Sequence, residues 1–119
     1  MIVVAQQAED VVGFTPDYEF LIDPNRDSPG VPNMVRVDPG TCDGLALANE
    51  GDEIVLRDGG GAAVDVVVYG SGSFSGVVPH PGGVNAGHSL ERRPPEQDTD
   101  DCSRDFFDRY PPTPGALPE

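Results

Sequence analysis

Hydrophobic and polar residues alternate most clearly in the middle of the chain. Over residues 54–57 and again over residues 64–69, side chains alternate with the period of two that paired strands require. Three consecutive glycines, Gly59 to Gly61, lie between these stretches and supply the backbone freedom for a tight reversal. The pattern predicts a β-hairpin.

Shorter patterns predict the remaining elements. Residues 6–12 indicate a helical turn that ends at Gly13. We expect loops over residues 71–87 and 94–101, one packed aromatic anchor at 106–110, and an extended proline-rich end after it. Further short strands are predicted at residues 1–5, 18–22, 34–37 and 89–93. Together these elements predict an all-β fold with long irregular connections.

Composition agrees with short elements and adds a strong charge signal. Gly (15) and Pro (13) are abundant, and Asp and Glu (21) outnumber the basic residues (7), all of them Arg, to give a net charge of −14. This charge repels a phosphate backbone, so we expect no direct nucleic-acid binding. An acidic surface without Lys suits a salt-rich medium and points to a halophilic source, with a GC-rich genome as the alternative explanation.

Neither a membrane segment nor a metal-binding cysteine motif is visible. No apolar run reaches bilayer-spanning length, and the first residues lack the regions of a secretory signal, so we expect no membrane insertion. The expected location is cytoplasmic as written, or secreted or at the cell surface if a segment precedes Met1. Cys42 and Cys102 have no CxxC partner. They are either free or one disulfide, which would stabilise the fold by roughly 4 kcal/mol.

His88 and Ser89 are the residues that first suggest hydrolase chemistry. Adjacent residues on a strand point to opposite faces, so His88 is badly placed to activate Ser89. A Gly-x-Ser-x-Gly turn is absent from the sequence, and His80 stands in a loop between prolines. We therefore expect a solvent-facing histidine and a strand serine in place of a catalytic triad.

Two acidic loops are candidates for calcium. Asp23, Asn25 and Asp27 have the first ligand spacings of an EF-hand-like loop, but Ser28 occupies the glycine position and Met34 stands where a bidentate Glu is needed. The second loop contains Asp98, Asp100 and Asp101. A solvated acidic turn is the preferred interpretation of both loops.

Two other patterns are explained by strand structure. The glycines at 59–61 are not followed by a Lys or by a predicted helix, so a hairpin turn explains them better than a phosphate-binding loop. Asp52 and Glu53 are adjacent and diverge across a strand, which gives them no common substrate. No catalytic residue and no cofactor are expected.

Residues 45–70, 87–92 and 112–115 resemble the C-terminal half of a lamin tail domain, an immunoglobulin-like β-sandwich of nuclear lamins that also occurs in bacterial and archaeal proteins. The resemblance covers about half of the chain. It implies that a side chain cannot fit at Gly51 or Gly87, that Leu90 points into the sandwich, and that Arg92 pairs with Asp65 or with a nearby backbone carbonyl. The positions that carry it are Asn49, Gly51, Asp52, Asp65, Tyr69, Gly87, Ser89, Leu90, Arg92, Pro114 and Gly115.

The chain departs from that family at its beginning. A complete lamin tail domain opens with three further strands, one of which contains a Trp, whereas this chain has 0 Trp. The resemblance therefore implies an incomplete sandwich over residues 1–115, with a tail at 116–119. Missing strands leave edges that invite association. The preferred explanation for the missing strands is a start placed too late or a truncated gene. A partner that supplies the missing strands is the third explanation.

These observations predict a non-catalytic structural or protein-interaction module of a halophilic archaeon, and not an enzyme. The expected partner is another protein, or a second copy bound through exposed strand edges. Two alternatives remain open at this stage. One is a calcium-stabilised cell-surface module that uses Asp23, Asn25 and Asp27, and the other is an accessory domain of a secreted nuclease or hydrolase.

Overall fold

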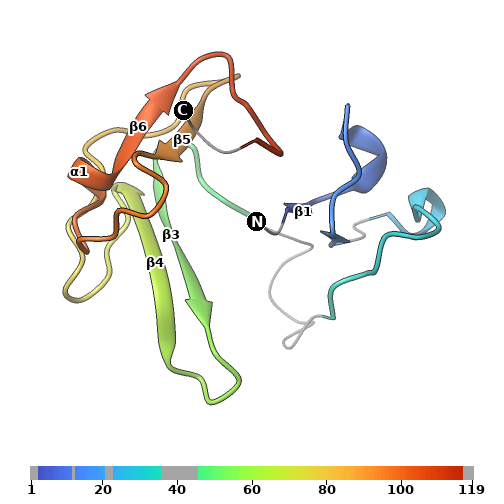
Figure 1. The fold of residues 1–119 in the computed structure, drawn as a ribbon, viewed down its shortest axis with the longest axis horizontal. Coiled ribbons are helices and arrows are strands. Elements are labelled where there is room, and N and C mark those ends of the chain that lie inside the picture. Colours follow the sequence, from blue (N-terminus) through green and yellow to red (C-terminus); the bar gives the residue numbers. More distant parts are fainter. Residues whose placement is uncertain (1–2, 12, 21–22, 36–45, 117–119) are drawn as a thin grey trace. The chain divides into compact units, whose positions relative to one another are not determined.

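The computed structural model describes residues 3–11, 13–20, 23–35 and 46–116 (Figure 1). The chain divides into two compact units, Met1–Ala46 and Leu47–Glu119. Short strands and turns make up most of the described residues, together with one α-helix of four residues. The prediction of a mostly β fold is confirmed at this level, while the single domain predicted over residues 1–115 stays a prediction.

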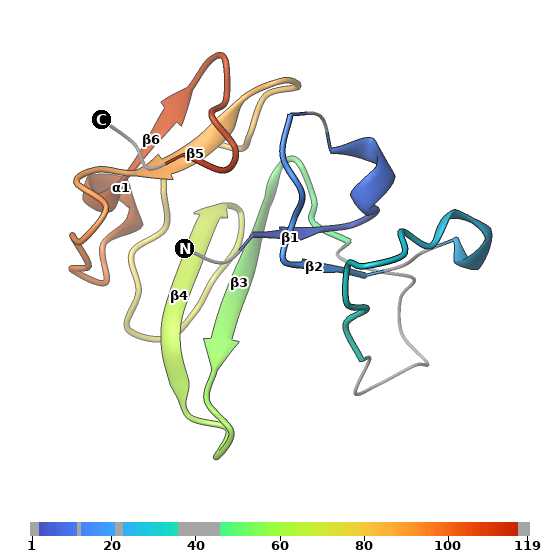
Figure 2. The same ribbon diagram turned by 45° about the vertical axis from the view of Figure 1, so that its right-hand side comes forward.

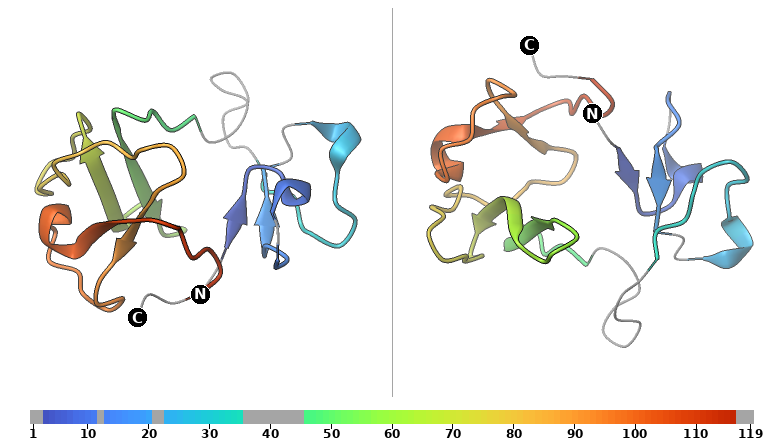
Figure 3. Two further views of the ribbon diagram at one scale, coloured as in Figure 1. Left: turned by 90° about the horizontal axis from the view of Figure 1, so that it is seen from above. Right: turned by 60° about the horizontal axis from the view of Figure 1, so that its bottom comes forward.

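The first unit is built around the buried carboxylate of Glu19. Strands β1 (Val4–Ala5) and β2 (Tyr18–Glu19) pair in parallel (Figure 3). The Glu19 side chain is fully buried and accepts hydrogen bonds from the backbone N–H of Ala8 at 2.7 Å and of Ser28 at 3.1 Å. It thereby joins the 3-10 turn η1 (Ala8–Asp10) to the segment that follows the second 3-10 turn, η2 (Pro24–Arg26).

The second unit contains the predicted hairpin. Strand β3 (Gly51–Arg57) pairs antiparallel with β4 (Ala63–Gly70), and the register shifts beyond Leu56 so that Val64 is the additional residue of a bulge on β4. In the turn, Asp58 Oδ1 accepts the backbone N–H of Gly60 and of Ala62, each at 2.9 Å. The side chain of Asp58 therefore closes the reversal that the glycines permit.

β4 is the central strand of the second unit. On the edge away from β3, the carbonyl of Val68 accepts the N–H of His80 at 2.9 Å, and Gly70 N–H donates to the carbonyl of His80 at 2.9 Å. Val68 and Phe106 are buried together with Cys102, and the residues packed against them are Val66, Val67, Phe74, Val77 and Leu90. The core of the unit thus lies between β4 and the C-terminal third of the chain.

The C-terminal third forms a second antiparallel pair. Strand β5 (Ser89–Arg92) pairs with β6 (Phe106–Arg109), which follows helix α1 (Cys102–Asp105) directly. Figures 1 and 2 show β5 and β6 at one end of the hairpin, with the turn between β3 and β4 extending away from them. The hairpin therefore has a packed end near β5 and an exposed tip.

The structure corrects several predicted elements. The stretch at 106–110 is more than an aromatic anchor because residues 106–109 form strand β6. Strand structure near the N-terminus is limited to β1 and β2 among the described residues, and Met34 and Val35 lie outside any strand. Strands were also predicted over residues 18–22 and 34–37. Of these, residues 21–22 and 36–37 lie outside the described residues. The hairpin, the strand at 89–92 and the turn at 8–10 are confirmed.

Candidate functional site

The guanidinium of Arg92 connects β5 to β4 and to the loop before α1. Its Nη2 lies 2.7 Å from Asp65 Oδ1, and its Nη1 lies 3.8 Å from Asp98 Oδ2. The same group stacks over the ring of Phe106, 4.9 Å from the ring centroid. Of the two partners predicted for Arg92, Asp65 or a backbone carbonyl, Asp65 is the one that its guanidinium contacts.

Asp105 lies behind this ion pair and is almost completely buried, with 1 % of its surface exposed. Its carboxylate accepts hydrogen bonds from Thr99 N–H at 2.8 Å, from Thr99 Oγ1 at 2.9 Å and from Gln97 Nε2 at 2.9 Å. Burial by itself raises the pKa of Asp105, but these hydrogen bonds and the charge of Arg92 outweigh it and lower the pKa. The side chain is therefore ionised and fixes the loop at 97–99.

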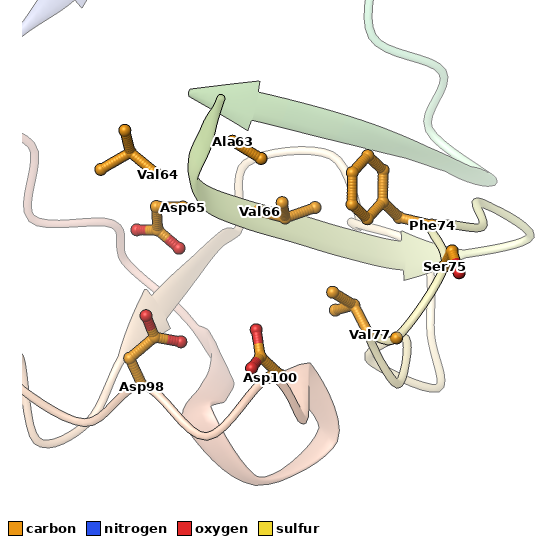
Figure 4. Close-up of a pocket in the computed structure, with 10 residues that line it drawn as sticks. Ala63, Val64, Asp65, Val66, Phe74, Ser75, Val77, Asp98 and Asp100 are labelled. Atoms are coloured by element: carbon orange, nitrogen blue, oxygen red, sulfur yellow. The ribbon is translucent and has the colours of Figure 1, made fainter. Parts of the chain in front are cut away.

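A pocket of about 210 Å³ lies beside Asp65. Figure 4 shows its apolar wall, formed by residues of β4 and by Phe74 and Val77, and its acidic wall, formed by Asp65, Asp98 and Asp100. Of these carboxylates, Asp65 and Asp98 are already neutralised in part by Arg92. The pocket offers an acidic rim without a nucleophile paired to a base.

His88 and Ser89 make separate contacts. Nδ1 of His88 lies 2.8 Å from Asp108 Oδ1, and its ring packs against Tyr110 with 5.0 Å between the ring centroids. Ser89 Oγ instead donates to Glu91 Oε1 at 3.4 Å. The histidine thus has a carboxylate partner that sequence reasoning missed, but the serine does not belong to the same constellation.

Glu91 is the centre of a second polar cluster. Its side chain is 10 % exposed, and its oxygens lie 3.9 Å from Arg93 Nη2 and 3.6 Å from Arg109 Nε. Thr113 Oγ1 also donates to Glu91 Oε1, at 2.9 Å. The exit segment, which includes Pro114 and Gly115, therefore returns to β5, and with β5 it lines a pocket of about 200 Å³.

The turn before β3 is held by the side chains of Asp52 and Tyr69 and by the backbone of Asn49, three of the positions that carry the family resemblance. Asp52 accepts the N–H of Ala48 at 3.1 Å and of Glu53 at 2.9 Å, while the carbonyl of Asn49 accepts the N–H of Val84 at 3.1 Å. Tyr69 donates its hydroxyl to the carbonyl of Ala48 at 2.7 Å. Burial, and then the charge of Asp52, raise the pKa of Tyr69.

The two motif glycines serve different purposes. A Cβ at Gly51 would lie 2.0 Å from the backbone nitrogen of Ser71, so a side chain cannot fit there, as predicted. At Gly87 the prediction of a steric conflict is wrong, because a Cβ would meet only Tyr110, at an ordinary 3.8 Å. Gly87 is required by its backbone instead, since its φ of +79° is rarely adopted by residues with a side chain.

The calcium candidates use their side chains within their own loops. Asp23 Oδ1 accepts from the backbone and the side chain of Asn25 at 2.9 and 3.0 Å, and Asp27 Oδ1 accepts from Asn33 at 3.2 Å. In the acidic loop, Asp101 caps α1 by accepting the N–H of Ser103 at 3.1 Å. Within the described ranges, no group of three or more His, Cys, Asp or Glu side chains is arranged to hold a metal ion.

Cys102 is a buried thiol with 2 % of its surface exposed. Its sulfur accepts the N–H of Val68 at 3.4 Å and donates toward the carbonyl of Val66 at 3.8 Å. Burial is the main cause that raises the pKa of this thiol. The other half of the predicted disulfide, Cys42, lies outside the described residues, so the disulfide stays a prediction.

Comparison with protein-family models, with curated proteins and with solved structures finds no match for this chain. The resemblance to a lamin tail domain accordingly stays a prediction that rests on the residues quoted for it. The helices of the described part of the chain are all too short or too polar to cross a membrane.

Sequence reasoning missed the most deeply buried polar residues, Glu19 and Asp105. Asp105 carried a usable signal, because Asp101 and Ser103 form a helix-capping pattern just before it. Glu19 carried none, because its partners are backbone N–H groups of distant turns. The partners of Glu91 were also missed, because Arg93 follows β5 while Arg109 lies on β6, and the cluster forms only when β5 and β6 pair.

Proposed function

We propose that this protein is a non-catalytic structural or protein-interaction module, built as an incomplete immunoglobulin-like β-sandwich that resembles the C-terminal half of a lamin tail domain. The scaffold contacts of the quoted positions support this proposal. Arg92 is bonded to Asp65, Leu90 packs against the core, and Tyr69 fixes the turn before β3. Each side chain stabilises a junction between elements, which is what a binding scaffold requires.

The separation of His88 from Ser89 carries the proposal. A hydrolytic site needs the serine hydroxyl within hydrogen-bond reach of the base. Here the histidine contacts Asp108 on β6, and the serine hydroxyl donates to Glu91. His88 is therefore engaged by Asp108 and Tyr110 at the end of the β5–β6 pair, where it fixes the last residues of β6.

A hydrolysis assay tests this proposal. The full chain and its Ser89→Ala and His88→Asn variants are incubated with an activated ester, with Ser73→Ala as a control at an exposed serine. We expect all four proteins to release product at the same slow rate, because His88 is engaged by Asp108, and the Glu91 carboxylate that Ser89 contacts is surrounded by Arg93, Arg109 and Thr113. A rate that Ser89→Ala and His88→Asn abolish and Ser73→Ala retains would overturn the proposal, provided that circular dichroism shows the variants folded.

A further inference from the structure

Within the described residues, one edge of β3 has no strand partner. Backbone hydrogen bonding alternates along an antiparallel strand. Ser71 N–H donates to the carbonyl of Glu50 at 3.1 Å, and the register pairs these two residues in continuation of the ladder. The even-numbered residues of β3 therefore bond to β4, and the backbone groups of the odd-numbered residues 53, 55 and 57 point away from it.

The described residues leave most of this edge without a backbone partner. Glu53 N–H is held by the side chain of Asp52 at 2.9 Å, while Val55 and Arg57 have no backbone bond beyond those of the hairpin within the described ranges. Ile54 and Leu56 are 40 % and 60 % exposed. A strand with open backbone groups and exposed apolar side chains is a template for pairing with another strand.

The charges along β3 favour a copy of the same strand. Glu53 lies near one end and Arg57 near the other, two residues on either side of Val55. An antiparallel partner with the same sequence brings the acidic end of one strand to the basic end of the other. The present contact of Arg57, a 3.0 Å bond to the carbonyl of Gly61, is exposed and easily exchanged.

We propose that two copies of this protein associate by antiparallel pairing of their β3 strands around a two-fold axis at Val55. This inference builds on the proposed function and names the partner of the module. In this register Glu53 faces Arg57 of the other copy, and Ile54 faces Leu56. The pairing also places odd-numbered residues opposite odd-numbered ones, as the orientation of the open backbone groups demands.

Neighbouring registers fit less well. A two-fold axis at Ile54 also pairs odd with odd, but it sets Arg57 opposite Gly51 and the charged Asp52 opposite Leu56. An axis between Ile54 and Val55 sets odd-numbered residues opposite even-numbered ones, so their backbone groups do not meet. Of these three registers, the one with its axis at Val55 both lets the open backbone groups bond to each other and places opposite charges face to face.

Net charge sets the conditions under which the pairing is seen. Each copy carries −14, and the chosen register also brings Asp52 near Asp58 of the other strand. Added salt screens this overall repulsion. The dimer is therefore expected to become tighter as salt is added, although salt weakens the two Glu53–Arg57 pairs.

Sedimentation equilibrium of the full chain, over a range of protein and salt concentrations, tests the proposal with a charge-exchange series. Glu53→Arg and Arg57→Glu each place like charges opposite each other twice, so each is expected to weaken the dimer about tenfold. The double variant restores opposite charges and is expected to return to within about threefold of the wild type. Glu96→Arg and Arg104→Glu repeat the charge changes at exposed positions away from β3.

Val55→Pro removes an edge N–H at the two-fold axis and is expected to abolish the dimer, with circular dichroism reporting whether the hairpin remains folded. A chain that is monomeric under all conditions would overturn the proposal. That is the result expected if another part of the same chain covers the edge of β3. A dimer that is indifferent to the charge-exchange series would also overturn it. Either result leaves the non-catalytic function standing, because the ester assay tests that function separately.

Discussion

The ion pair between Arg92 and Asp65 gives the sharpest quantitative prediction. The two groups come from different strands, lie 2.7 Å apart, and have 18 % and 34 % of their side chains exposed. We propose a double-mutant cycle with Arg92→Gln and Asp65→Asn, which removes each charge while keeping a polar side chain of similar size. Because the pair joins β5 to β4, its loss is expected to weaken the whole second unit.

The magnitude follows from partial burial. Two unit charges about 4 Å apart interact by about 4 kcal/mol at an effective dielectric constant of about 20, whereas exposed pairs measure about 0–1 kcal/mol. For this partly exposed pair we expect a coupling energy of about 1–2 kcal/mol. Arg92→Gln alone is expected to cost about 2–3 kcal/mol, because it also leaves Asp98 without its cation and loses the stacking on Phe106.

Urea unfolding followed by circular dichroism measures these free energies, and equal m-values among the variants establish that the same transition is compared. Arg104→Gln on the exposed side of α1 is the matched control and is expected to change stability by less than about 0.5 kcal/mol. An Arg92→Gln variant as stable as this control, or single-variant effects that add without coupling, would contradict a stabilising ion pair between Arg92 and Asp65.

Three further predictions follow from buried groups. Tyr69→Phe removes the bond to the carbonyl of Ala48 and is expected to lower the free energy of unfolding by about 1 kcal/mol, as measured by urea unfolding. Asp105→Asn is expected to cost about 2–4 kcal/mol. The pKa of Asp105 is lowered from its ordinary 3.8, so the difference in free energy of unfolding between the variant and the wild type should be full above about pH 4. This difference should narrow as the pH falls through the folded-state pKa of Asp105, and a difference that is equal at all pH values would contradict the prediction. Cys102 is expected to react with a thiol reagent only after urea is added, because it is buried and its pKa is raised, and rapid reaction in the native protein would contradict its position.

The hairpin was predictable because its signals are local. Side chains alternate with a period of two over residues 54–57 and 64–69, and the glycines between them permit the reversal. The bulge at Val64 was not predictable, since the register depends on which side chains the rest of the unit packs against β4. The pairing of Arg92 with Asp65 was predicted only as one of two options. Opposite charges in a sequence do not show how close the two side chains lie in the folded protein.

The elements that sequence reasoning missed depend on tertiary contacts. Residues 102–105 form a helix of one turn, which is too short to be stable by itself. It forms because Asp101 caps it, and because Cys102 and Asp105 find buried partners in β4 and in the loop at 97–99. Likewise β6 follows the helix without a turn signal, and its partner β5 is separated from it by a polar loop.

Amide hydrogen exchange of the full chain, read by nuclear magnetic resonance, tests most directly whether residues 47–116 form a β scaffold organised around β4. The slowest amides are predicted to be those that bond across elements, namely His80 to Val68, Cys102 to Val78 and Arg93 to Asp105. The amide of Gly60 in the exposed turn is predicted to exchange far faster. Equal exchange rates at all four positions would contradict the scaffold and every role assigned to it.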